Sequence, residues 1–85
     1  MGDTVKLLVT KEWVVVPGLT QYATYSFQNV TDKNVYLQQA PSAPDATDIG
    51  FKVEPAMVAQ VYKEASDIYV RSIGAGGLVY FNEVT

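Results

Sequence analysis

The chain of 85 residues contains no cysteine and no histidine. Without cysteine, no disulfide can reinforce the fold, and most zinc, copper and iron sites lack their usual ligands when both residue types are missing. The same absences remove the commonest general base and the strongest nucleophile from any catalytic site. We therefore expect a protein without a metal, without a cofactor and without catalytic residues.

Positive charge is also scarce. Six Lys and Arg residues stand against nine Asp and Glu residues, which gives a net charge of −3, and the basic residues are scattered along the chain. Nucleic-acid binding requires clustered basic residues, so we expect no nucleic-acid partner. The longest uninterrupted apolar run, residues 13–17, is far too short to span a bilayer, so we expect no membrane partner.

Short apolar segments alternate with turn residues along the whole chain, and no stretch keeps a helical period over three turns. The segments are separated by Pro-Gly, Pro-Ala and similar breaks at intervals of about 8–12 residues, which is the spacing of an all-β sandwich or barrel. The expected strands are Val5–Thr10, Trp13–Val16, Tyr22–Gln28, Val35–Gln39, Asp48–Glu54, Met57–Tyr62, Ile68–Ile73 and Leu78–Val84.

The stretch from Tyr22 to Gln39 carries the clearest alternation. Two runs rich in Tyr, Phe and Val flank the turn residues 29–34, and this pattern predicts a β-hairpin with a longer loop. One face of each run is apolar, which predicts the start of a core made by Ala23, Tyr25, Phe27, Val35 and Leu37.

These patterns predict one all-β domain over residues 1–85, a small antiparallel β-sandwich, jelly-roll-like, with seven or eight short strands. The first two apolar runs form either two strands or one long bent strand. Residues 1–17 are interpreted as an N-terminal arm or an edge strand, because an apolar segment of this kind needs a partner that covers it.

Two patterns suggest small-molecule sites but have simpler explanations. The glycines of Gly74-Ala75-Gly76-Gly77 lack the Lys and the helix of a phosphate-binding loop, so we interpret them as a hairpin turn with positive φ angles. Asp45 and Asp48 offer too few oxygens for a calcium loop and are interpreted as solvated loop acids.

Tyrosines are the more informative feature. If the apolar residues of the last strands face the core, then Tyr36, Tyr62, Tyr69 and Tyr80 face outward. Tyrosine is enriched at interfaces because it combines an apolar ring with a hydroxyl. We take these four residues, together with Trp13, as a candidate interface; the alternatives are ordinary exposed aromatics or an incorrect register in one strand.

Several short motifs occur in an order that resembles the small β-sandwich virion proteins of tailed bacteriophages. The resemblance extends over Tyr22–Val84 and leaves Val5–Pro17 without a counterpart. The motifs are Phe27-Gln28-Asn29-Val30, Val35-Tyr36-Leu37, Ala43-Pro44, Gly50-Phe51, Glu54-Pro55, Ile68-Tyr69-Val70-Arg71-Ser72 and Gly77-Leu78-Val79.

This resemblance implies a non-enzymatic structural protein of the virion, made in the cytoplasm of the bacterial host. The expected role is a capsid decoration or cement protein that stabilises the outer surface of the head. The expected partners are further copies of itself, most simply a trimer, and the major capsid protein or another virion protein. The alternative is a tail or fibre-tip module that binds a receptor or a carbohydrate.

Overall fold

The computed structural model of the chain describes residues 4–45, 50–74 and 77–84. These ranges contain eight strands and no helix, which confirms the all-β fold class. None of the described residues belongs to a helix long and apolar enough to cross a bilayer. The strands are β1 (Thr4–Val9), β2 (Val14–Val15), β3 (Thr24–Asn29), β4 (Val35–Ala40), β5 (Phe51–Val53), β6 (Val58–Tyr62), β7 (Asp67–Ser72) and β8 (Gly77–Val84).

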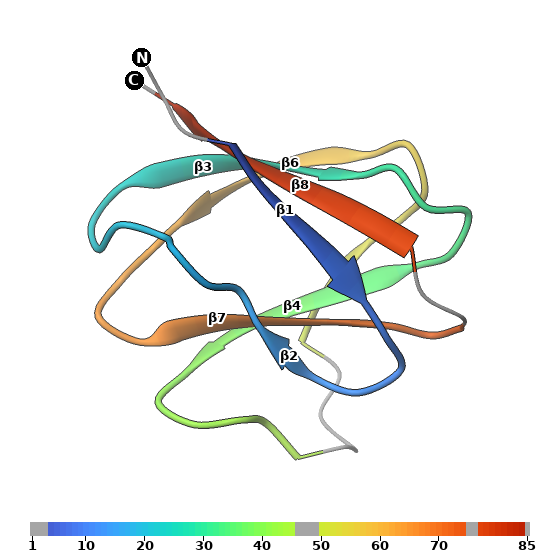
Figure 1. Cartoon of the computed structure of the whole chain (residues 1–85), viewed down its shortest axis with the longest axis horizontal. Coiled ribbons are helices and arrows are strands. Elements are labelled where there is room, and N and C mark those ends of the chain that lie inside the picture. Colours follow the sequence, from blue (N-terminus) through green and yellow to red (C-terminus); the bar gives the residue numbers. More distant parts are fainter. Residues whose placement is uncertain (1–3, 46–49, 75–76, 85) are drawn as a thin grey trace.

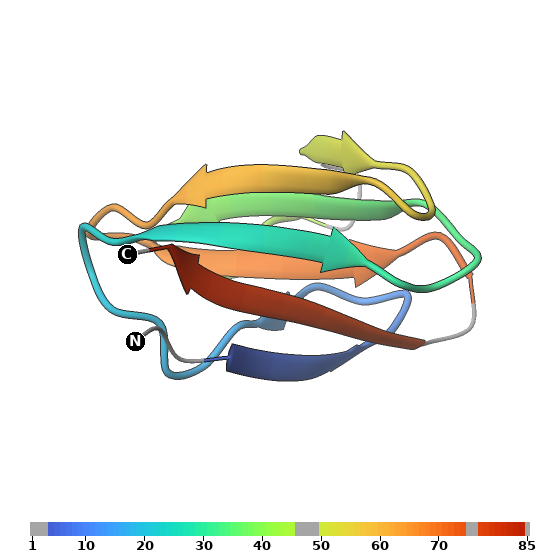
Figure 2. The same ribbon diagram turned by 90° about the horizontal axis from the view of Figure 1, so that it is seen from above.

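The strands form two antiparallel sheets of four strands that pack as two layers (Figures 1 and 2). The first sheet has the order β1-β8-β3-β6 and the second has the order β2-β7-β4-β5. The pairs β1–β8, β2–β7, β3–β6 and β4–β5 together describe one long antiparallel hairpin, rolled up so that successive pairs alternate between the sheets. This is the jelly-roll topology, and the predicted jelly-roll-like sandwich is confirmed.

The predicted hairpin of residues 22–39 is wrong in its pairing. β3 belongs to the first sheet, where it pairs with β8 and β6, whereas β4 belongs to the second sheet, where it pairs with β7 and β5. The turn residues between them therefore carry the chain from one layer to the other. Alternation identified the buried face of each strand correctly, but two strands with buried faces can pack across a core as well as side by side.

The glycine segment was also misinterpreted as a hairpin turn. β7 and β8 lie in different sheets, so the segment joins the two layers, and Ala75 and Gly76 fall outside the described residues. Among the described glycines of the turns, positive φ angles occur at Gly18 and Gly50, not at Gly74 or Gly77. At the N-terminus, β1 and β2 are two strands rather than one bent strand, and β1 forms the edge of the first sheet beside β8.

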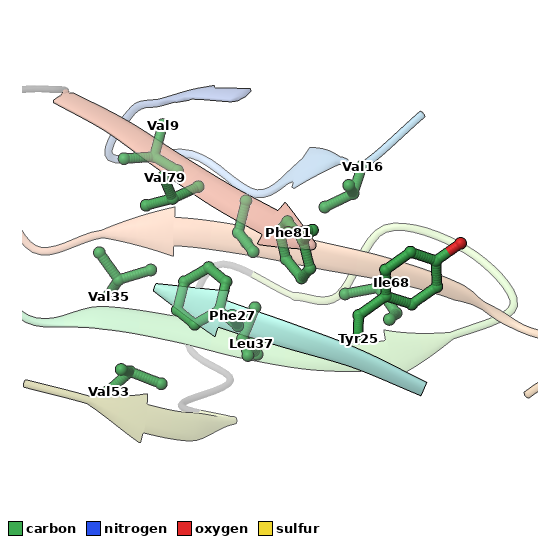
Figure 3. Packing of buried hydrophobic residues seen from close by; sticks show 11 residues of the cluster. Val9, Val16, Tyr25, Phe27, Val35, Leu37, Val53, Ile68, Val79 and Phe81 are labelled. Carbon is green, nitrogen blue, oxygen red and sulfur yellow. The ribbon is translucent and has the colours of Figure 1, made fainter. Parts of the chain in front are cut away.

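The core lies between the two layers and is supplied by both (Figure 3). At its centre the rings of Phe27 and Phe81 lie with their centroids 4.7 Å apart and tilted by 50°. The predicted burial of Tyr25, Phe27, Val35 and Leu37 is confirmed. The buried apolar residues are Val9, Val16, Tyr25, Phe27, Val35, Leu37, Val53, Ile68, Val70, Val79 and Phe81.

The turn before β6 holds an alanine in an unfavourable backbone conformation. The N–H of Met57 donates to the carbonyl of Glu54 over 3.1 Å, Pro55 occupies the second position, and Ala56 has a φ of 65°. A type II turn of this kind favours glycine at the third position, because an L side chain is strained at positive φ.

Replacing Ala56 with glycine is expected to raise the free energy of unfolding by about 0.5–1 kcal/mol, the relief of left-handed strain less the backbone entropy of glycine. Urea denaturation measures the change. Ala65→Gly is the matched control, because Ala65 is exposed and has no positive φ, and it should leave stability unchanged or lower it. A loss of stability in Ala56→Gly would contradict the strain argument.

Candidate functional site

The residues predicted as an interface lie on two opposite outer faces of the sandwich. Tyr36 in β4 and Tyr69 in β7 belong to the second sheet, whereas Tyr62 in β6 and Tyr80 in β8 belong to the first. In each of these strands the tyrosine alternates with residues that pack on the core, so the ring points away from it. The four tyrosines therefore do not make one surface, which corrects their treatment as a single face.

Aromatic and basic side chains meet on the outer face of the second sheet. Strand register places Tyr36 between Lys52 and Arg71, and the guanidinium of Arg71 lies 5.7 Å from the centroid of the Trp13 ring. A cation over an aromatic face at this distance is attracted by the ring electrons. We call this surface the Trp13 face; it consists of Trp13, Val15, Tyr36, Gln38, Lys52, Tyr69 and Arg71.

A second cross-strand row completes the Trp13 face. Tyr69 lies between Val15 of β2 and Gln38 of β4, two residues along the strand from the row that contains Arg71. Val15 is exposed and Tyr69 is partly buried by these neighbours. The second sheet therefore presents two tyrosines, a tryptophan and an arginine in adjacent cross-strand rows. These residue types are enriched at protein interfaces.

The Trp13 ring is held in place by the connection after β4. Its Nε1–H donates to the backbone carbonyl of Asp45 over 3.0 Å. Gly50, with a φ of 72°, allows the close approach: a Cβ there would lie 3.2 Å from the ring and 2.5 Å from the carbonyl oxygen of Leu37. A cleft of about 310 Å³ lies beside the ring and is lined by Lys11, Glu12, Trp13, Ala43, Pro44 and Arg71.

The outer face of the first sheet is different in character. The ammonium of Lys6 lies 5.9 Å from the centroid of the Tyr80 ring. The neighbours of these residues are polar on one side, where Thr4 donates its hydroxyl to the Asn82 side chain over 2.7 Å, and Gln28 lies opposite Tyr80. On the other side Leu8 lies opposite Leu78, and these residues are 60% and 44% exposed. Tyr62 stands apart at β6, opposite Thr24. This face therefore has separate tyrosines rather than an aromatic cluster.

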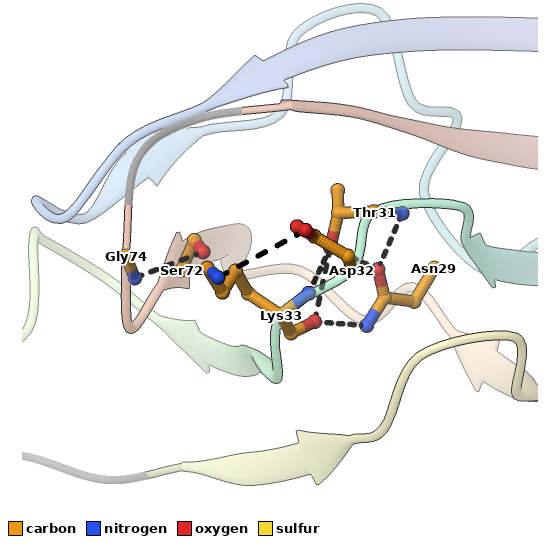
Figure 4. A network of polar contacts seen from close by, with 6 residues as sticks. All are labelled: Asn29, Thr31, Asp32, Lys33, Ser72 and Gly74. Carbon is orange, nitrogen blue, oxygen red and sulfur yellow. Dashed lines mark hydrogen bonds and ion pairs between the residues drawn. The ribbon is translucent and has the colours of Figure 1, made fainter.

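Asn29 is the most completely satisfied polar side chain of the interior (Figure 4). Its amide nitrogen donates to the carbonyls of Lys33 and Val53, both over 2.8 Å. Its amide oxygen accepts from the N–H of Thr31 over 3.0 Å and from the Thr31 hydroxyl over 2.7 Å. With only 1% of its surface exposed, Asn29 joins the two layers and offers no free group to a ligand.

Residues 4–45, 50–74 and 77–84 contain no cluster of three or more Asp or Glu side chains that could hold a metal ion. Of the acids considered for calcium, Asp48 falls outside the described residues.

Sequence reasoning missed the contribution of Arg71 and Lys52 to the Trp13 face. Arg71 lies two residues after Tyr69 on the same strand, and Lys52 faces outward opposite Tyr36. Two-residue spacing places Arg71 on the same face as Tyr69. Its contact with Trp13 could not be inferred, because Trp13 precedes it by more than fifty positions and the intervening pairing was unknown.

Comparison with models of known protein families, with curated proteins and with solved structures found no match.

Proposed function

We propose that this protein is a non-enzymatic structural component of a tailed-bacteriophage virion that binds the outer surface of the head as a homo-oligomer. The observation that carries the proposal is the Trp13 face, which gathers Trp13, Tyr36, Tyr69 and Arg71 on one side of a sheet. Trp, Tyr and Arg dominate the energetics of protein–protein contacts. The order of motifs along the chain supplies the expectation that the partner is a capsid or another virion protein.

Binding through the Trp13 face is expected to be lost when a carboxylate is placed at its centre. In Tyr69→Glu, burying the new charge against a partner without compensation costs several kcal/mol, so affinity should fall about a hundredfold or more. The matched control is Tyr80→Glu, the same change on the opposite outer face, which should bind as the unmodified protein does. Co-sedimentation with capsids assembled without this protein measures both.

Circular dichroism of both variants establishes that each keeps its β-sheet structure. Failure of the unmodified protein to bind capsids, or equal binding by both variants, would contradict the proposal.

The cleft beside Trp13 favours a second candidate, a receptor- or carbohydrate-binding module, because Glu12 offers a carboxylate next to an aromatic ring. Glycan-array binding that Trp13→Ala abolishes, without any binding to capsids, would favour this second function.

A further inference from the structure

The part of the sandwich that the structure describes has four edge strands, and three of them are protected against pairing with another chain. β2 has two residues and β5 has three, including Lys52, while β1 contains Lys6. Short strands and lysines are the usual means by which an edge is kept from templating another strand. β6, with the sequence VAQVY, has five residues, no charge and no proline, so its edge lacks these means of protection.

The backbone groups that β6 leaves unpaired can be identified from its pairing with β3. The N–H of Asn29 donates to the carbonyl of Met57, and the N–H of Lys63 donates to the carbonyl of Ala23. Since hydrogen-bonded pairs recur at every second residue, Ala59 and Val61 direct their N–H and C=O groups toward β3, as do the carbonyl of Met57 and the N–H of Lys63. Val58, Gln60 and Tyr62 consequently direct theirs toward the free edge.

A side chain already closes one end of this free edge. The amide nitrogen of Gln39 donates to the carbonyl of Tyr62 over 2.6 Å, and its amide oxygen accepts from the N–H of Glu64 over 2.8 Å. Gln39 thus occupies the place that a neighbouring strand would take. In the part of the chain that the structure describes, the N–H of Tyr62 and the N–H and C=O groups of Val58 and Gln60 remain available.

An apolar groove opens beside the same edge, where the two layers separate. It has a volume of about 210 Å³ and lies between β6 and the strands β4, β5 and β7 of the second sheet. Phe51 at its rim is 58% exposed, and Met57 and Val58 are 42% and 57% exposed. The residues that line the groove are Leu37, Gln38, Gln39, Phe51, Gln60, Val61 and Ile68.

We propose that β6 pairs antiparallel with β6 of a second copy of this chain, in a register centred on Ala59. In this register Val58 of each copy lies opposite Gln60 of the other, so the N–H and C=O groups of both residues obtain partners. Ala59 lies opposite Ala59 at the two-fold axis, where its small side chain permits close approach. The pairing segment is uncharged, so two chains of net charge −3 meet without like charges in the strand.

The same register fills the apolar groove. Met57 continues the alternation of β6 on the side of Ala59 and Val61, the side that faces the interior. Met57 of one copy therefore lies opposite Val61 of the other and inserts toward Phe51. The flexible thioether of methionine suits an irregular apolar gap of this kind.

The proposed dimer does not depend on the proposed function. It predicts a two-fold contact, whereas the family resemblance implies a trimer.

The absence of cysteine allows a direct test. The variant Ala59→Cys carries a single thiol in each chain. In the proposed register the two residues at position 59 form a pair without hydrogen bonds, and the Cα atoms of such a pair lie about 4.5 Å apart, within the range of a disulfide. On mild oxidation this variant is expected to convert to a covalent dimer. Lys6→Cys, at the opposite edge of the same sheet, should stay a monomer on non-reducing gels.

The second measurement is light scattering after size exclusion of the unmodified protein, with an expected mass of twice 9.3 kDa. Gln60→Lys should weaken dimerisation at least tenfold by placing two charges at the paired edge. The matched control Gln28→Lys makes the same change one strand inward on the same outer face and should dimerise normally. A monomer at high concentration or a trimer would overturn the proposal, and cross-linking at Gln60→Cys instead of Ala59→Cys would overturn the register.

Discussion

Replacing Phe27 with alanine is expected to lower the free energy of unfolding by about 3–5 kcal/mol, the usual cost of deleting a buried ring and leaving a cavity. The Phe27 side chain is fully buried and contacts Phe81 at the centre of the core. A chain of 85 residues has a total stability of about 4–13 kcal/mol at the usual value per residue. The expected loss is therefore a large part of the total free energy of unfolding.

Urea denaturation followed by tyrosine and tryptophan fluorescence measures this change. Phe51→Ala is the matched control in dilute solution, because the same ring is deleted where 58% of it is already exposed, and the expected loss is below about 1 kcal/mol. Equal losses in the two variants would mean that the Phe27–Phe81 pair is not the centre of the core.

Replacing Asn29 with aspartate is expected to cost several kcal/mol, roughly 3–5. The amide nitrogen of Asn29 donates to two carbonyls, that of Lys33 in the loop between β3 and β4 and that of Val53 in β5. A carboxylate in its place donates nothing and directs negative charge at both carbonyl oxygens. Both carbonyls thereby lose this donor, and the buried charge has only the N–H and the hydroxyl of Thr31 as donors.

The loss of stability in Asn29→Asp is expected to depend on pH. Burial raises the pKa of the introduced carboxyl above its value in the unfolded chain, so the folded state binds the proton more tightly. The deficit relative to the unmodified protein should therefore shrink as the pH falls toward about 4 and grow as the pH rises. Asn34→Asp is the control, and its deficit should be small and insensitive to pH. A constant deficit in Asn29→Asp would argue against a buried charge.

The two proposed contacts use different parts of the molecule. The Trp13 face lies on the outer side of the second sheet, whereas the β6 contact extends the first sheet at its edge. Antiparallel pairing of two identical edges creates a two-fold axis perpendicular to the sheet, so both Trp13 faces would point in the same direction. A dimer of this kind could engage a repeating protein lattice at two points, and the second contact would be made at high effective concentration.

The sequence by itself determined the class of the fold and the membership of much of the core. Alternation of apolar and polar residues marks which side of a strand is buried, because side chains point to opposite faces at every step. Tyr25, Phe27, Val35 and Leu37 were identified in this way and are buried. Turn residues marked most strand ends, although β2 and β5 are shorter than their apolar runs suggested.

The tertiary structure alone decided which strands are neighbours. A period of two residues does not distinguish a partner beside a strand from a partner across the core, so residues 22–39 were interpreted as a hairpin when β3 and β4 lie in different layers. The same ambiguity merged the tyrosines into one face, although Tyr36 and Tyr69 lie on one sheet and Tyr62 and Tyr80 on the other. Arg71 over Trp13 and the unprotected edge of β6 follow only from long-range pairing, which local sequence does not encode.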